Sequence, residues 1–166
     1  NGSQTSLYYD LSWNSIGDII WETTFGAGLA MNGNGNGINF NQRVENRSSY
    51  AQTVNIPLSG AKSGASQIEL NPVNGDLTIS GNVYNDNNKP FYVYGANSKM
   101  LTIGTGLTGN PSVSLTIAQY SKVKLTAAQS WGDSTHGVAI QQGEFWLDSG
   151  GSLASTSVPI TVGLSD

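Results

Sequence analysis

Gly75-Asp-Leu-Thr-Ile-Ser-Gly81 contains a triplet, Leu77-Thr78-Ile79, whose return along the chain decides the fold. It stands again 24 residues later as Leu101-Thr102-Ile103, and the related Leu125-Thr126-Ala127 follows after another 24. Val54-Asn55-Ile56 lies 23 residues before the first triplet, and Phe145-Trp146-Leu147 lies near the next expected position. Each triplet alternates apolar, polar and apolar residues, which places two side chains on one face of a strand and one on the other.

This interval predicts a parallel β-helix, or β-solenoid. One coil of such a fold takes roughly 20–25 residues, and equivalent strands of successive coils pair in parallel about 4.8 Å apart. Leu115-Thr116-Ile117 lies between two of the triplets, so we expect a strand on a second face of the same coil. The alternative all-β architecture is an antiparallel jelly-roll sandwich, which also has strands at short, regular intervals. Gly/Ser-rich corners in place of two-residue hairpins favour the solenoid.

Short apolar stretches separated by Gly, Asn and Ser supply the other strands. We expect one continuous domain of at most about seven coils, about 30 Å tall. Residues 1–49 are expected to form an N-terminal cap or edge region, and residues 50–166 the coils. The predicted strands are 37–44, 52–58, 67–70, 76–80, 91–94, 99–103, 113–117, 122–127, 138–141, 144–147 and 159–162.

The proposed cap is the most apolar part of the chain. Within it, Trp13–Trp21 has isoleucines at roughly helical spacing and also a β-branched run, so a short helix and a strand both fit. The candidate cap residues are Tyr8, Tyr9, Trp13, Ile19 and Trp21.

The composition excludes several classes of protein. The 166 residues include 21 glycines and no cysteine, and seven Lys and Arg stand against eleven Asp and Glu. A chain without cysteine has no disulfide, thiolate nucleophile or zinc knuckle. The acidic balance predicts no nucleic-acid partner, and no apolar run approaches the roughly 20 residues of a membrane span. The Ser, Thr, Asn and Gly content favours an extracellular or cell-surface location, and the lack of a leader at Asn1 suggests a processed or shortened chain.

No combination of residues predicts catalysis or metal binding. Asp133, Ser134 and His136 lie too close in sequence to act as a triad, and no nucleophile-elbow motif is present. With a single histidine, the common histidine-based metal sites are excluded. Asn85–Asn88 lacks the spacing of a calcium loop and predicts an Asn-rich turn. Glu144 and Asp148 lie about 13 Å apart on an extended strand, too far for a glycosidase pair. We therefore expect no catalytic residue, no metal and no cofactor.

Aromatic residues are the stronger candidates for binding. Tyr92 and Tyr94 alternate with Phe91 and Val93, so the two tyrosines share one face of a strand. That face either packs or stacks against sugars or a neighbouring subunit. Trp131 and Trp146 are similar candidates.

The end of the chain is a candidate assembly strand. Apolar residues alternate through 155–164 without Lys or Arg, and both ends of a solenoid expose unpaired strand edges. We expect end-to-end stacking or strand addition with other copies of the chain, through Val158, Ile160, Val162 and Leu164.

Residues 50–153 resemble a known family. Gly75–Asn82, Ser98–Gly104 and Gly143–Asp148 are similar to the strand units of autotransporter-associated β-strand repeats, and Trp13, Trp21 and the segment 37–40 are similar to the tryptophan-bearing region that often precedes them. These repeats occur in secreted or surface bacterial proteins, including adhesin passengers that fold as right-handed parallel β-helices. The family's Thr-Gly-Gly-Thr-Thr corner is replaced here by residues 85–90. The resemblance implies a surface β-helix for display, adhesion or scaffolding.

The sequence thus predicts an extracellular, non-catalytic structural or adhesive protein: a surface adhesin passenger or a self-assembling filament subunit. The alternative is a carbohydrate-binding module that uses aromatic side chains as stacking platforms. A polysaccharide lyase or hydrolase on a β-helix is the least favoured, because no acid–base pair is visible.

Overall fold

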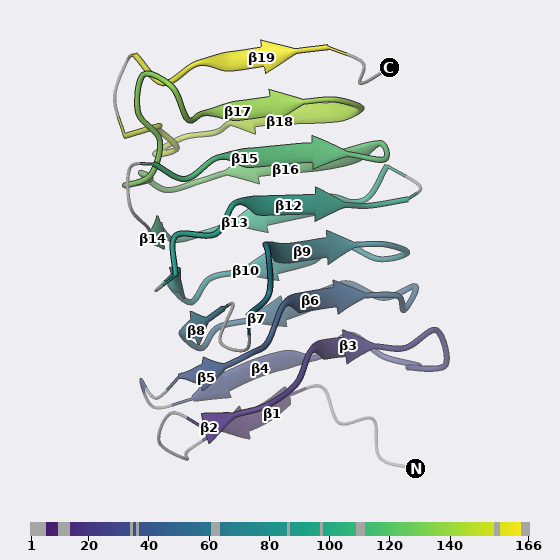
Figure 1. Ribbon diagram of the computed structural model, residues 1–166. Helices are drawn as coiled ribbons and strands as arrows, with labels where there is room; N and C mark the ends of the chain where they lie inside the picture. Colours follow the sequence, from purple (N-terminus) through teal and green to yellow (C-terminus); the bar gives the residue numbers. More distant parts are fainter. Residues whose placement is uncertain are drawn as a thin grey trace.

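The computed structural model describes residues 6–9, 14–33, 35, 37–60, 64–85, 87–96, 98–108, 112–154 and 157–163, with side chains from residue 16 onward. The described residues form nineteen short strands and no helix, and hence no helix that could cross a membrane. The strands belong to three sheets, and every pairing between them is parallel (Figure 1).

Sheets A and C each contain seven strands, and sheet B contains five. Sheet A comprises β1 (Ser6–Tyr9), β4 (Ala30–Gly33), β7 (Gln52–Val54), β10 (Leu77–Ile79), β13 (Met100–Ile103), β16 (Ser121–Leu125) and β18 (Gly143–Leu147). Sheet B comprises β2 (Asn14–Ser15), β5 (Ile38–Asn39), β8 (Leu58–Ser59), β11 (Val83–Tyr84) and β14 (Leu107–Thr108). Sheet C comprises β3 (Ile19–Trp21), β6 (Arg43–Asn46), β9 (Ile68–Pro72), β12 (Phe91–Tyr94), β15 (Leu115–Ala118), β17 (Val138–Ile140) and β19 (Ile160–Val162).

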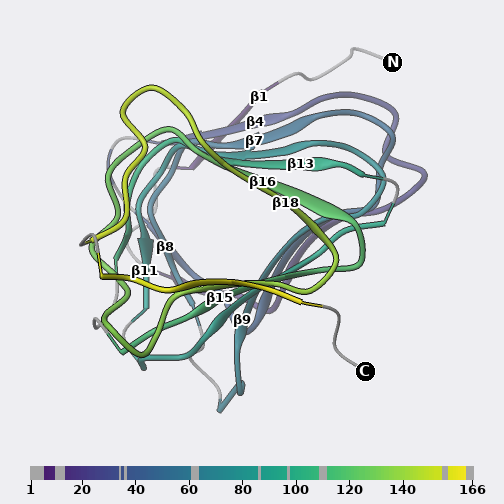
Figure 2. The ribbon, with the colours of Figure 1, turned by 90° about the horizontal axis from the view of Figure 1, so that it is seen from above.

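The chain visits the sheets in the order A, B, C, then climbs to the next coil. It completes six turns and begins a seventh. Sheet C runs left to right across the front of Figure 1 while the chain rises, so the coil is right-handed; Figure 2 shows the three faces from above. The prediction of an all-β parallel β-solenoid is confirmed. The sandwich alternative is wrong, because no described strands pair antiparallel.

The recurring triplet is the register mark it was expected to be. Leu77 pairs with Leu101 and Ile79 with Ile103, one coil apart in sheet A. Leu115–Ala118 lies on another face, in sheet C, as predicted.

Two of the expected alignments are wrong by two residues. Ile103 pairs with Leu125, and Val54 pairs with Ile79, whereas a constant interval would align each with the preceding apolar position. Corner lengths vary, so that equivalent residues lie from 20 to 26 positions apart. A shift of two keeps every apolar side chain on the inner face, whereas a shift of one would turn them all outward.

The core consists of stacked inward-facing residues. In each sheet, apolar side chains of successive coils lie directly above one another and are buried. Burial of this column-like core supplies the main stabilisation, at about 25 cal/mol for each Å² of apolar surface removed from water. The columns include Leu77–Leu101–Val123 in sheet A, Ile38–Leu58–Val83–Leu107 in sheet B and Ile68–Phe91–Leu115–Val138 in sheet C.

The N-terminal region is not a separate cap. Strands β1 to β6 pair within the same three sheets, so the expected boundary at residue 50 does not divide the fold. Ile19 and Trp21 lie in β3 with buried side chains, and the suggested helix over Trp13–Trp21 is replaced by strands β2 and β3. Tyr8 and Tyr9 lie in β1, the terminal strand of sheet A, whereas Trp13 lies outside the described residues.

Candidate functional site

Two carboxylates that the sequence analysis did not pair meet on the outer face of sheet C. Glu45 in β6 and Glu69 in β9 are both buried, and the amide of Asn71 donates hydrogen bonds to both, at 3.0 and 3.3 Å. Arg43 Nε lies 2.9 Å from Glu69 and 3.5 Å from Glu45, and Arg47 also pairs with Glu45. The shared donors hold the carboxylates within the separation of at most about 9 Å that glycosidases use.

The electrostatics of this pair are those of a structural network. Burial alone would raise the pKa of Glu69, but hydrogen bonds from Gln67 and Gln42 and the ion pair with Arg43 hold that pKa below its ordinary value. A general acid needs the opposite, a raised pKa that keeps its proton near neutral pH. Two arginines balance the two carboxylates, so the network joins adjacent coils and has no proton to deliver.

The substitution Glu69→Gln is therefore expected to destabilise the fold. At neutral pH it should cost about 1–3 kcal/mol, because charge-assisted hydrogen bonds become neutral ones. The native pKa of Glu69 lies below the unfolded value of 4.5, so its contribution is present above pH 4.5 and fades as the pH falls through the lower native pKa. Urea unfolding of both proteins across this range measures the difference, and a gap that does not narrow in acid would contradict the assignment.

Tyr92 and Tyr94 share the outer face of β12, as predicted, but they do not form a platform. Their side chains are half-buried, and their rings stack on each other with centroids 5.5 Å apart and planes 20° apart. Each ring thus uses one of its faces against the other. Gln67 donates to the Tyr94 hydroxyl at 3.4 Å, which ties the pair to the carboxylate network.

Trp131 is not a binding residue, contrary to expectation. Its side chain is completely buried, 6.5 Å from Phe91 between ring centroids, at the level where sheet B has ended with β14. Gln129 takes over part of the missing strand: its side-chain oxygen accepts from the Leu107 amide at 2.8 Å and from the Trp131 indole at 3.2 Å. Trp131 therefore plugs the core where a third strand is lacking.

Residues 133–136 form a polar corner. Asp133 accepts hydrogen bonds from the backbone amide and hydroxyl of Thr135 and from His136, which lower the pKa of Asp133 strongly. His136 Nδ1 lies 3.0 Å from Asp133, but within the described residues no hydrogen bond joins His136 to exposed Ser134. The arrangement orders a turn and does not activate a nucleophile.

The Asn-rich turn holds itself together without a cation. The Asn85 side chain accepts from the Lys89 amide at 2.9 Å and donates to the Lys89 carbonyl at 2.5 Å. Asp86 lies outside the described residues. Among the described residues no cluster of three or more His, Asp or Glu side chains is placed to hold a metal.

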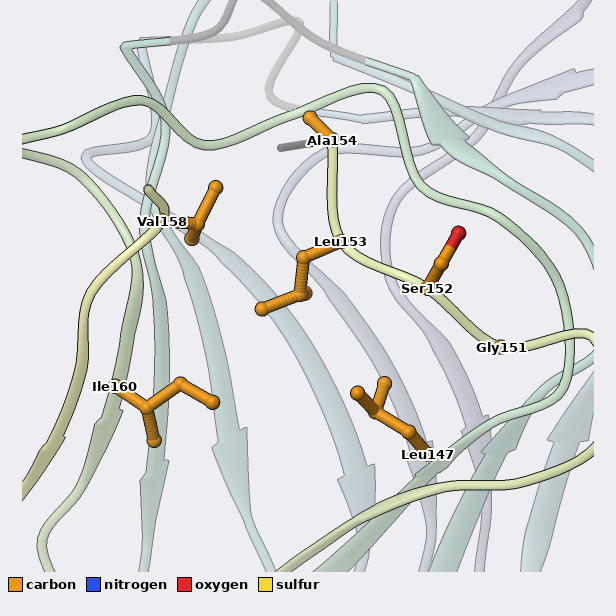
Figure 3. A pocket seen from close by; sticks show the side chains of 7 residues that line it. All are labelled: Leu147, Gly151, Ser152, Leu153, Ala154, Val158 and Ile160. Atoms are coloured by element: carbon orange, nitrogen blue, oxygen red, sulfur yellow. The ribbon is translucent and has the colours of Figure 1, made fainter. Parts of the chain in front are cut away.

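The C-terminal end of the solenoid is open. A hollow of about 500 Å³ lies at the top of the last coil, and the side chains of Leu147, Leu153, Val158 and Ile160 project into it (Figure 3). Gly151, Ser152 and Ala154 complete its lining. Strands β18 and β19 are the last strands of sheets A and C, so each has one edge without a partner among the described strands.

The exposed residues at this end occupy core positions. Leu147 is 48% exposed, although Leu125, its partner one coil below, is buried. Ile160 is 49% exposed above buried Val138, and Val162 is 77% exposed. Of the candidate assembly strand, Ile160 and Val162 are thus open to a partner, Val158 is buried, and Leu164 lies outside the described residues.

Two signals for these surfaces were present in the sequence. Glu45 and Glu69 lie 24 residues apart, the same interval as the triplets, and the interval places them on adjacent coils. Leu147 ends the last recurring triplet, so its inner face has no later triplet to cover it. Comparisons with protein-family models, curated proteins and solved structures find no match to this chain.

Proposed function

We propose that this chain is an extracellular, non-catalytic structural and adhesive protein, a surface-displayed or secreted solenoid that lengthens head to tail. The observation that carries the proposal is the open C-terminal end, where core positions of two sheets are half or more exposed beside unpaired strand edges. Natural proteins cover or charge such edges, because they otherwise pair with other chains. Resemblance to autotransporter-associated repeats supports the surface location.

The first coil of a second copy is the partner that fits this end. Strands β1 and β3 are the first strands of sheets A and C, and they run in the same direction as β18 and β19. Leu7 holds the register position that continues, coil by coil, through Met31, Val54 and Ile79 up to Leu147. The two ends of the described chain lie at opposite ends of the stack, so a second copy can follow the first (Figure 1).

A double substitution tests the proposal. Ile160→Lys with Val162→Lys is expected to abolish concentration-dependent assembly, because two ammonium groups would have to be buried in an apolar contact. Light scattering across a dilution series and negative-stain electron microscopy report the result, with regular fibres expected for the parent chain. Thr161→Lys is the matched control: it lies on the same strand with its side chain outward. A parent chain that stays monomeric at every concentration would overturn the proposal.

A further inference from the structure

The outer face of β18 places an indole between two carboxylates. Glu144 and Trp146 lie beside Lys122 and Lys124 of the coil below, and Asp148 continues the same outward alternation. Alternate residues of a strand are separated by about 7 Å, so a carboxylate stands on each side of the ring. Sequence alternation alone indicates this order, but not what lies against the ring.

Trp146 presents one ring face to solvent. The side chain is 46% exposed, and Lys124 Nζ lies over the ring, 5.8 Å from its centroid. This cation–π contact occupies one face of the indole and fixes its orientation. The opposite face is a flat apolar surface, which Tyr92 and Tyr94 do not offer.

The charges around the indole are balanced. Lys122 pairs with Glu144 at 2.9 Å, and Lys124 lies 3.6 Å from Asp148. The patch therefore carries donors and acceptors of both signs but no net charge among these four groups. It matches a neutral ligand that is rich in hydroxyl groups, whereas an acidic or basic ligand gains little.

A second exposed aromatic residue stands at the corner that leads into β16. Tyr120 is 65% exposed and has φ +61°, directly after Gln119 at φ +55°. Two successive non-glycine residues in this left-handed region are costly, and the hydrogen bond from the Tyr120 amide to the Gln142 carbonyl, 2.8 Å, helps to hold them. Because β16 pairs with β18, the strained corner lies at the edge of the same face.

We infer that this face, centred on Trp146 and flanked by Glu144, Asp148 and Tyr120, is a binding site for neutral pyranose sugars. The apolar face of a sugar ring would stack on the indole while its hydroxyl groups donate to the carboxylates. The site is independent of head-to-tail assembly: in a stacked second copy the position next to Trp146 is the small Ser6, in β1.

The test uses the whole chain on an array of neutral hexose and N-acetylhexosamine oligosaccharides, followed by calorimetry with the best of them. Saturable binding is expected, with Trp146→Ala weakening the affinity about ten-fold or more and Trp146→Phe retaining most of it. Tyr50→Ala is the control: Tyr50 is a comparably exposed aromatic residue, and its loss should leave the affinity unchanged. Circular dichroism verifies that each variant is folded.

Two outcomes would overturn the inference: no saturable binding of the parent chain to any neutral oligosaccharide, or a Trp146→Ala variant that binds as the parent does. Neither outcome depends on assembly, which the lysine variants at Ile160 and Val162 measure separately.

Discussion

Replacement of Trp131 by alanine is expected to lower the free energy of unfolding by about 3–5 kcal/mol, the usual cost of a large aromatic-to-alanine change in a core. Trp131 is the largest completely buried side chain, and it fills the coil at the level where sheet B has no strand. No strand can close over the cavity from that side, so the lost contacts are not recovered. The indole hydrogen bond to Gln129 is lost as well.

Urea unfolding followed by far-ultraviolet circular dichroism measures this loss, because it does not depend on tryptophan fluorescence. Trp146→Ala is the matched control, since it removes the same side chain from an exposed position and is expected to change stability by about 0.5 kcal/mol. Equal effects of the two substitutions would show that Trp131 is not a core plug.

Gly81→Ala is expected to have the second large effect, about 3 kcal/mol or more, from overpacking against backbone. A Cβ atom at Gly81 would overlap the carbonyl group of Ile56 in the coil below and would come within 2.9 Å of the Pro57 nitrogen. Neither neighbour is a flexible side chain, so one coil would have to move away from the next. The Gly81 amide also donates to the Val54 carbonyl at 3.2 Å, a bond that such a movement would stretch.

Gly17→Ala serves as the control for Gly81→Ala, because a Cβ there meets no atom within 4 Å. Thermal unfolding of the two variants should separate them clearly, with Gly17→Ala close to the parent chain. If Gly81→Ala melts at the parent temperature, the coils are not as closely spaced at this corner as the structure has them.

The solenoid was predictable because its evidence is periodic. Each coil repeats the same problem, an apolar pair facing inward and a polar residue outward, and Leu77 and Leu101 solve it at a fixed interval. Corner lengths carry no such constraint, and for this reason the alignments of Val54 and Leu125 were wrong by two residues. The expected cap failed for a related reason, since the apolar residues of β3 face the same core as those of later coils.

The candidate sites were less predictable, because they depend on which residues of different coils lie side by side. Tyr92 and Tyr94 were correctly placed on one face, yet only the structure shows that their rings stack on each other. Trp131 has the same local sequence features as an exposed aromatic residue, and its burial follows from the end of sheet B two coils from the top.

By itself, the sequence determined the fold class, the parallel stacking and the inward or outward direction of most strand residues, because alternation and a near-constant interval are properties of order along the chain. Only the tertiary structure decided the register between coils, the pairing of Glu45 with Glu69, the plug at Trp131 and the open end at Leu147 and Ile160. These features arise where side chains about one coil apart come within a few ångströms of each other. That proximity depends on the length of every corner between them, and corner length is weakly constrained by local residue preference.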